Sequence, residues 1–140
     1  MVAFTAFATM DRTYDNETPM LFQGVKENID DFYNSTISQL TCPVDGVYFF
    51  SVTVSTPSSH GETGRVRLMQ EKRLIVTANA AFSEAFEYES GSTSAIAYCA
   101  AGERLWVKTA DPSTISNEQR RFDGNGYARS SFSGVLIKAG

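Results

Sequence analysis

In this chain of 140 residues, two consecutive arginines, Arg120 and Arg121, are the strongest candidates for ligand binding. Tyr127 and Arg129 follow within the same segment, NEQRRFDGNGYARS. Guanidinium groups bind phosphate, sulfate and carboxylate groups through paired hydrogen bonds, and a tyrosine ring can stack on a sugar. These four residues form the candidate ligand-binding site. A solvated loop with Tyr127 as a packing anchor is the alternative.

Residue types that would support catalysis are sparse. The single histidine, His60, lies in the turn-like segment SSHGETG, and a Ser-His-Asp triad would have to recruit it. The sequence contains no GxSxG elbow, no P-loop and no HExxH motif. The glycines of DGNG suit a tight turn better than a phosphate cradle. The sequence therefore argues against an enzyme.

Acidic residues are concentrated at Asp30-Asp31 and in SEAFEYES, which holds Glu84, Glu87 and Glu89. Solvated strand or loop faces explain such clusters without any ligand. Oxygen ligands contributed by several loops would also suit calcium. The residues alone leave both interpretations open.

Cys42 and Cys99 lie too far apart for a CxxC redox or zinc pattern. They are either two buried free thiols or one disulfide, which would imply an oxidising compartment. Acceptor triplets for N-glycosylation begin at Asn16 and Asn34 and also favour secretion, although Pro19 makes the first a poorer acceptor. The opening MVAFTAF lacks the pattern of a signal peptide, so we expect a mature domain or fragment with Met1 added.

Short alternating runs predict an all-β fold. The run GVYFFSVTV at 46–54 has one face that begins apolar and turns polar, and a second, wholly apolar face formed by Tyr48, Phe50, Val52 and Val54. Further strands are expected at 65–70, 72–80, 92–100, 104–110 and 130–139, with turn formers between them. For residues 11–40 we expect short strands and a long connection.

Composition and length indicate one globular domain. Hydrophobic residues make up 42% of the chain and charged residues 20%, which is ordinary for a folded protein. The net charge of −4 argues against nucleic acid as a partner. No apolar run approaches the roughly 20 residues that span a bilayer.

A set of spaced residues matches a family signature that places an aromatic, an Asn or Asp, a second aromatic, a Phe and then Gly-x-Tyr-x-Phe. The matching positions are Phe22, Asn28, Tyr33, Leu40, Gly46, Tyr48 and Phe50. Leu40 replaces the usual Phe, and Val52 stands where Phe or Tyr is expected. The remaining similarities are VAFTAF at 2–7, GERLWVKT at 102–109 with Trp106, and SSFSGVLIK at 130–138 with Phe132 and Gly134. The chain thus resembles, over its whole length, the globular head of the complement C1q family within the C1q/tumour-necrosis-factor superfamily.

The resemblance implies an all-β, ten-stranded jelly-roll sandwich that assembles as a homotrimer, with residues 1–140 as a single C1q domain. It also implies that Cys42 and Cys99 form a disulfide, that Pro43 fixes a turn and that Gly46 begins a core strand. Aromatic residues on both faces of 47–50 are easier to explain if something covers the second face. A three-fold ring of such contacts closes on itself.

The function implied by the resemblance is recognition. Family members are secreted, and many stalkless invertebrate relatives bind microbial glycans or lipopolysaccharide. The chain has no Gly-X-Y tract, so we expect a head cut from a longer chain or a stalkless member. We therefore expect an extracellular, trimeric, lectin-like protein of innate immunity whose three sites act together, with no nucleic acid or membrane insertion. A trimeric ligand that clusters a cell-surface receptor and a structural trimerisation cap are the alternatives.

Calcium is the one cofactor that the resemblance suggests. Some family members bind it near the three-fold axis with acidic side chains around one strand. Glu71 and Asn79 fall at two such positions, although neither is the expected aspartate.

Overall fold

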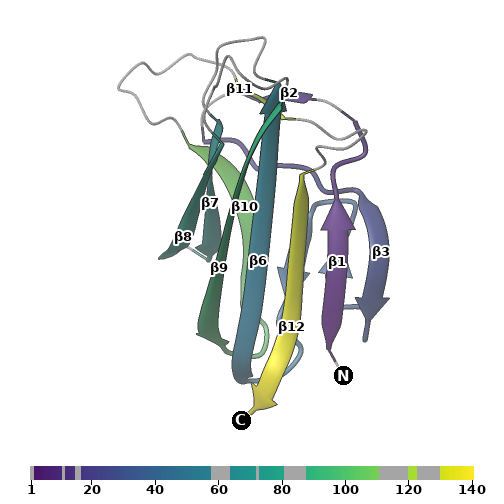
Figure 1. The fold of residues 1–140 in the computed structure, drawn as a ribbon. Coiled ribbons are helices and arrows are strands. Elements are labelled where there is room, and N and C mark those ends of the chain that lie inside the picture. Colours follow the sequence, from purple (N-terminus) through teal and green to yellow (C-terminus); the bar gives the residue numbers. More distant parts are fainter. Residues whose placement is uncertain are drawn as a thin grey trace.

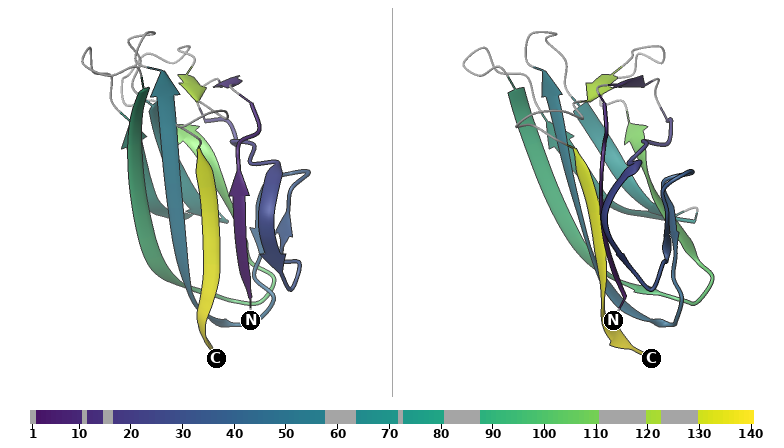
Figure 2. Two further views of the ribbon diagram at one scale, coloured as in Figure 1. Left: turned by 45° about the vertical axis from the view of Figure 1, so that its right-hand side comes forward. Right: turned by 90° about the vertical axis from the view of Figure 1, so that its right-hand side faces the viewer.

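Two five-stranded sheets pack face to face, and a two-stranded ribbon lies at one end of this sandwich (Figure 1, Figure 2). The computed structural model describes residues 2–10, 12–14, 17–57, 64–71, 73–80, 88–110, 120–122 and 130–140. Within these residues every strand pairing is antiparallel. The expected ten-stranded all-β sandwich is confirmed, and the ribbon is additional.

Strand order interleaves distant parts of the chain. The first sheet consists of β3 (Gly24–Ile29), β1 (Ala3–Phe7), β12 (Ser131–Ala139), β6 (Gly46–Pro57) and β9 (Tyr88–Cys99). The second sheet consists of β4 (Tyr33–Asn34), β5 (Gln39–Thr41), β10 (Arg104–Ala110), β7 (Gly64–Gln70) and β8 (Arg73–Ala80). The ribbon pairs β11 (Arg120–Phe122) with β2 (Arg12–Tyr14). Among the described residues, no helix has the length and apolar character needed to cross a membrane.

Strand β6 follows the predicted alternation and begins at Gly46, as expected. Its wholly apolar face points into the core, where the side chains of Tyr48, Phe50, Val52 and Val54 are buried. Phe49 points the other way and is 37% exposed. The second face of this strand therefore has no cover within the described part of the chain.

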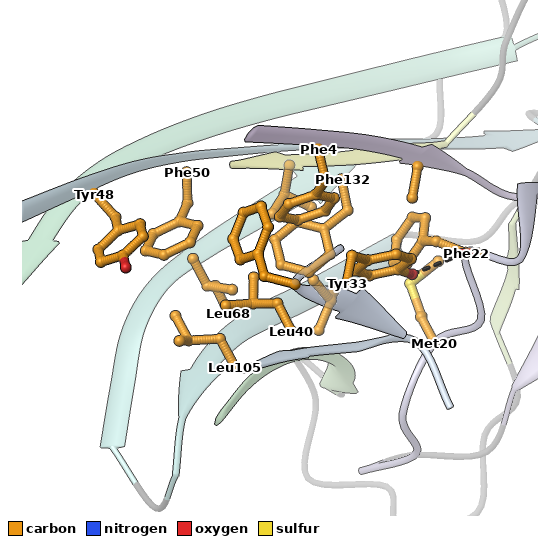
Figure 3. Packing of buried hydrophobic residues seen from close by; sticks show 14 of the residues in the cluster. Phe4, Met20, Phe22, Tyr33, Leu40, Tyr48, Phe50, Leu68, Leu105 and Phe132 are labelled. Carbon is orange, nitrogen blue, oxygen red and sulfur yellow. Dashed lines mark hydrogen bonds between the residues drawn. The ribbon is translucent and has the colours of Figure 1, made fainter. Parts of the chain in front are cut away.

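The centre of the core is an aromatic cluster between the sheets (Figure 3). The Phe4 ring stacks on Tyr33 with the ring centroids 4.6 Å apart and meets Phe132 edge-on at 5.0 Å. Gly134 makes room for this arrangement, because a Cβ atom there would lie 2.7 Å from the Phe4 ring. The Phe22 ring centroid lies 5.8 Å from that of Phe132, so the signature residues Phe22 and Tyr33 pack in the same cluster as Phe132.

The irregular stretch between β3 and β5 is organised by side-chain hydrogen bonds. Asn28 accepts from the Tyr33 backbone N–H at 3.1 Å and donates to the Tyr33 carbonyl at 2.8 Å. Between them, Asp30 and Asp31 both have positive φ, at 64° and 53°, a conformation that aspartate tolerates better than most residues. The signature Asn28 therefore closes this turn.

The two edges of the first sheet differ. Edge strand β3 exposes Lys26 and Glu27, and its pairing with β1 is irregular between Thr5 and Ala6. The opposite edge strand, β9, packs beside β8 of the second sheet. The sandwich is thus closed along one side and bears charged residues on the other.

Cys42 and Cys99 form a disulfide, which confirms the pairing implied by the resemblance. Cys42 follows β5 of the second sheet and Cys99 ends β9 of the first, so the bond connects the two sheets. Both residues are buried, and the Cys42 backbone N–H donates to the Glu103 carbonyl at 2.9 Å. The disulfide fastens the end of the sandwich at which β6 begins.

We predict that the double variant Cys42→Ala/Cys99→Ala unfolds with a free energy lower by about 4 kcal/mol, because the bond closes a loop between residues 57 apart. Urea unfolding with and without dithiothreitol measures this difference. The reductant should destabilise the wild type and leave the double variant unchanged. A wild-type shift below about 1 kcal/mol would show that the sheets hold together without this link.

Candidate interaction surfaces

The outer face of the first sheet is uncharged over its central strands. Cross-strand partners in an antiparallel sheet share a face, and the strand registers place the outward side chains. These are Val47, Phe49, Ser51, Thr53, Ser92, Ser94, Ile96, Tyr98, Ser131, Ser133 and Val135. Lys138, opposite Val47 near the end of β12, marks the rim of this set. We call these eleven residues, without Lys138, the uncharged face.

One half of the uncharged face is apolar and the other carries hydroxyl groups. Phe49 pairs with Ile96, which is 67% exposed, while Tyr98 is 53% exposed. In the other half, the Thr53 and Ser92 hydroxyl groups lie 2.9 Å apart, and Ser133 donates to Thr5 on β1. Neighbouring large apolar side chains that remain exposed often mark interaction sites. The apolar half is therefore the candidate contact surface.

The two consecutive arginines lie at one end of the sandwich. Arg120 and Arg121 belong to β11, where they pair with Tyr14 and Thr13 of β2. This ribbon lies at the end opposite both chain termini (Figure 1, Figure 2). Tyr127 and Arg129, the other two residues of the predicted ligand site, lie outside the described residues, as does His60.

The ribbon contains a third arginine, Arg12, which sequence analysis did not include in the candidate site. Arg12 pairs with Phe122, so three arginines occupy two adjacent short strands. Arg12 is distant from the others in sequence, and a three-residue strand has no periodicity to detect. Only the pairing of β2 with β11 brings it to the arginine-bearing end.

The two residues considered for calcium lie at opposite ends of one hairpin. Glu71 follows β7 at its turn with β8, whereas Asn79 pairs with Arg65 near the start of β7. Arg65, the partner of Asn79, lies six residue steps before Glu71, which corresponds to about 20 Å along the strand. The Glu71 carboxylate accepts the Arg104 backbone N–H at 2.9 Å. Glu71 and Asn79 therefore do not share one site.

The other acidic groups also fail to converge within the described residues, where no cluster of three or more potential metal ligands exists. Asp31 accepts a hydrogen bond from Asn28 at 3.2 Å and serves the turn before β4. Glu84 and Glu87 lie outside the described residues, and the backbone of Glu89 is in β9. Calcium gains no support from these residues.

Glu103 organises the end of the sandwich next to the disulfide. Its carboxylate accepts the Ala100 backbone N–H at 2.9 Å, the Gln70 amide at 3.0 Å and the Arg73 guanidinium at 2.8 Å. The backbone hydrogen bond, followed by those from Gln70 and Arg73, lowers the pKa of Glu103 below its ordinary value despite partial desolvation. This carboxylate has a structural role beside Cys99.

The fold defines a jelly-roll sandwich of the C1q and tumour-necrosis-factor type. A model of the C1q domain family matches residues 3–137, and the chain therefore belongs to the C1q domain family. It is 24% identical over 123 residues to the mouse (Mus musculus) complement C1q tumor necrosis factor-related protein 7. That match covers 88% of this chain and 39% of the relative, so the chain spans well under half of the relative's length.

Solved structures of the same fold confirm the architecture. The globular domain of zebrafish complement 1qA protein is similar with a TM-score of 0.77 and 17% identity, and each chain is covered completely. The Eiger TNF of S. frugiperda has a TM-score of 0.73 and 15% identity, covering 99% of this chain and 94% of that one. At these identities the likeness concerns the fold.

We predict that Glu103→Gln lowers the free energy of unfolding by about 1 kcal/mol at pH 7, the upper end of the range for ion pairs at the surface, because Glu103 itself is half-buried. Because the folded-state pKa of Glu103 is lowered, its stabilising contribution is complete above about pH 5 and is lost as the pH falls through that pKa. The difference between variant and wild type should therefore shrink towards pH 3.

Urea unfolding at several pH values measures this, with Glu27→Gln on the exposed edge strand as the control for removing one negative charge. An equal loss at pH 7 and pH 3 would assign the effect to the shape of the side chain rather than to its charge.

Proposed function

We propose that this chain is a secreted recognition module that assembles as a homotrimer and binds microbial glycans or lipopolysaccharide through its arginine-bearing end. The proposed activity is ligand binding rather than catalysis. The observation that supports assembly is the uncharged face, because no other described strand surface combines exposed Phe, Ile and Tyr side chains with an absence of charge. Such a surface suits burial against copies of the same chain. The observation that supports ligand binding is the pairing of β11 with β2, which gathers three arginines at one end of the sandwich.

Two features support an extracellular site of action. The disulfide between the sheets is stable in oxidising compartments and rare in the cytosol. The chain belongs to the C1q domain family, and its C1q/TNF-related homologues are typically secreted. Both observations fit a module that meets its ligand outside the cell.

The apolar half of the uncharged face and the arginine-bearing ribbon lie far enough apart to serve two roles, self-assembly and ligand binding. Phe49, near the start of β6, lies towards the end that carries the chain termini, whereas β11 lies at the other end (Figure 1). If the apolar halves meet in a trimer, three arginine-bearing ribbons are presented on one side. Three weak anion contacts then act together as avidity, which suits the repeated phosphate and carboxylate groups of a microbial surface.

We predict that Ile96→Glu converts the trimer into monomers. Each removed apolar contact costs about 1.5–3 kcal/mol, and burying an unpaired carboxylate costs more, so self-affinity should fall at least about 100-fold. Analytical ultracentrifugation at micromolar concentration measures the mass against the 15.4 kDa chain. Ile37→Glu is the matched control, because Ile37 is also exposed, at 51%, but lies beyond the uncharged face. A wild type that sediments as a monomer would refute the assembly.

We predict that Arg120→Ala/Arg121→Ala weakens binding to immobilised lipopolysaccharide and acidic polysaccharides at least tenfold while the mass of the assembly stays unchanged. Losing charge-assisted hydrogen bonds of about 1.5–3 kcal/mol each accounts for this size of effect. Lys26→Ala/Arg104→Ala is the charge-matched control, because it also removes two positive charges and both residues are exposed outside the ribbon of β2 and β11.

Binding should be measured with calcium and again with a chelator. No binding by an intact wild-type trimer would reject glycan recognition, and a cell-surface protein receptor would then be the ligand to test.

A further inference from the structure

The triplet Asn34-Ser35-Thr36 occupies the end of β4 and the turn that leads to β5. Asn34 and Thr36 are exposed, and the residue after the triplet, Ile37, is 51% exposed. Neither Ser35 nor Ile37 is proline, so the local backbone has none of the restriction that proline imposes. The triplet is an acceptor pattern for N-glycosylation on an accessible surface.

The Asn34 amide is held with its nitrogen unengaged among the described residues. Its Oδ1 accepts the Thr36 backbone N–H at 3.0 Å, an interaction that fixes the side-chain plane. Asn28, which is close in sequence, is the contrast: its Nδ2 donates to both Asp31 and the Tyr33 carbonyl. The structure therefore distinguishes an asparagine used for folding from an exposed one whose Nδ2 has no partner among the described residues.

We propose that Asn34 carries an N-linked oligosaccharide. In this transfer the Nδ2 atom forms a bond to C1 of the first sugar of a lipid-pyrophosphate-linked oligosaccharide, and the C1–O bond to the pyrophosphate breaks. The amide loses one proton to a base of the transferase, and the lipid pyrophosphate leaves. The proposal rests on the proposed secretion and is independent of the ligand.

The sheet register sets the surface that this glycan covers. Asn34 pairs with Gln39, and Gln39 pairs with Trp106, so the three side chains share a face. The neighbouring pair Tyr33 and Leu40 is buried, which makes the face of Asn34 the outer one. Two strand spacings, about 10 Å, separate Asn34 from Trp106. A glycan at Asn34 therefore lies over the outer face of the second sheet.

This placement keeps the glycan away from the proposed self-contact. The uncharged face belongs to the first sheet, and the core of the sandwich lies between it and the face of Asn34. A bulky, hydrated group at Asn34 thus leaves Phe49 and Ile96 accessible to another copy. The hydrated sugars would cover part of the outer face of the second sheet and leave the uncharged face of the first sheet free of sugar.

The test expresses the full chain behind a secretion signal in cultured animal cells and measures intact mass before and after treatment with peptide N-glycosidase. Protein from both medium and cells is analysed, because transfer occurs before secretion. We expect the wild type to lose the mass of one oligosaccharide, with Asn34 converted to aspartate in the peptide map. Asn34→Gln and Thr36→Ala should show no such loss, while Thr36→Ser should retain it.

Asn16→Gln provides the control for the other acceptor triplet and should leave the mass loss unchanged. An unmodified wild type, or a mass loss that disappears in Asn16→Gln and persists in Asn34→Gln, would overturn the assignment. Glycan-array binding by the same preparations is scored separately. A glycosylated chain that does not bind lipopolysaccharide would support glycosylation at Asn34 and would reject only the proposed ligand.

The single tryptophan of the chain reports where the glycan lies. If the sugars cover the face of Trp106, acrylamide should quench its fluorescence about twofold less efficiently before enzymatic deglycosylation than after it. The non-glycosylated Thr36→Ala variant, treated in the same way, should show no change. Equal quenching of the wild type before and after the enzyme would overturn the placement over Trp106.

Discussion

The buried hydroxyl group of Tyr33 is the constraint on which the N-terminal third of the fold depends. A hydroxyl removed from water needs a partner, and Tyr33 donates to the Phe22 carbonyl at 2.6 Å. Burial raises the pKa of Tyr33 to about 12, against a smaller opposing effect of the Ser38 hydroxyl, so the group stays a donor at physiological pH. Its ring stacks on Phe4. One side chain thus holds two irregular segments against a regular strand.

The long strands could be predicted because their alternation repeats over many residues. In β6 the buried face of Tyr48, Phe50, Val52 and Val54 was visible as a period of two, and the family resemblance implied the disulfide. Strands of two or three residues, such as β4 and β2, carry too few positions for a period. Their place is set by contacts with distant residues, as Asn28 with Tyr33 and Arg12 with Phe122 illustrate.

The candidate surfaces were only partly predictable for the same reason. Two adjacent arginines are visible in any sequence, but the arrival of Arg12 beside them depends on strand pairing. Glu71 and Asn79 matched family positions in sequence, yet a hairpin places them at its two ends. Aromatic residues on both faces of β6 indicated that its outer face also contacts something. The strand register then showed that Ile96 and Tyr98 lie on that outer face beside Phe49.

The charged, irregular edge at β3 has a consequence for how copies of this chain can meet. A free sheet edge is a template for adding further strands without limit, which leads to fibrils. Lys26 and Glu27 on β3 and the broken register beside Thr5 oppose that growth, while β9 is occupied along its side by β8. Attraction between copies is thereby directed to the faces of sheets rather than to their backbones. In the proposed assembly, contacts through Phe49 and Ile96 would therefore close at a finite number of subunits.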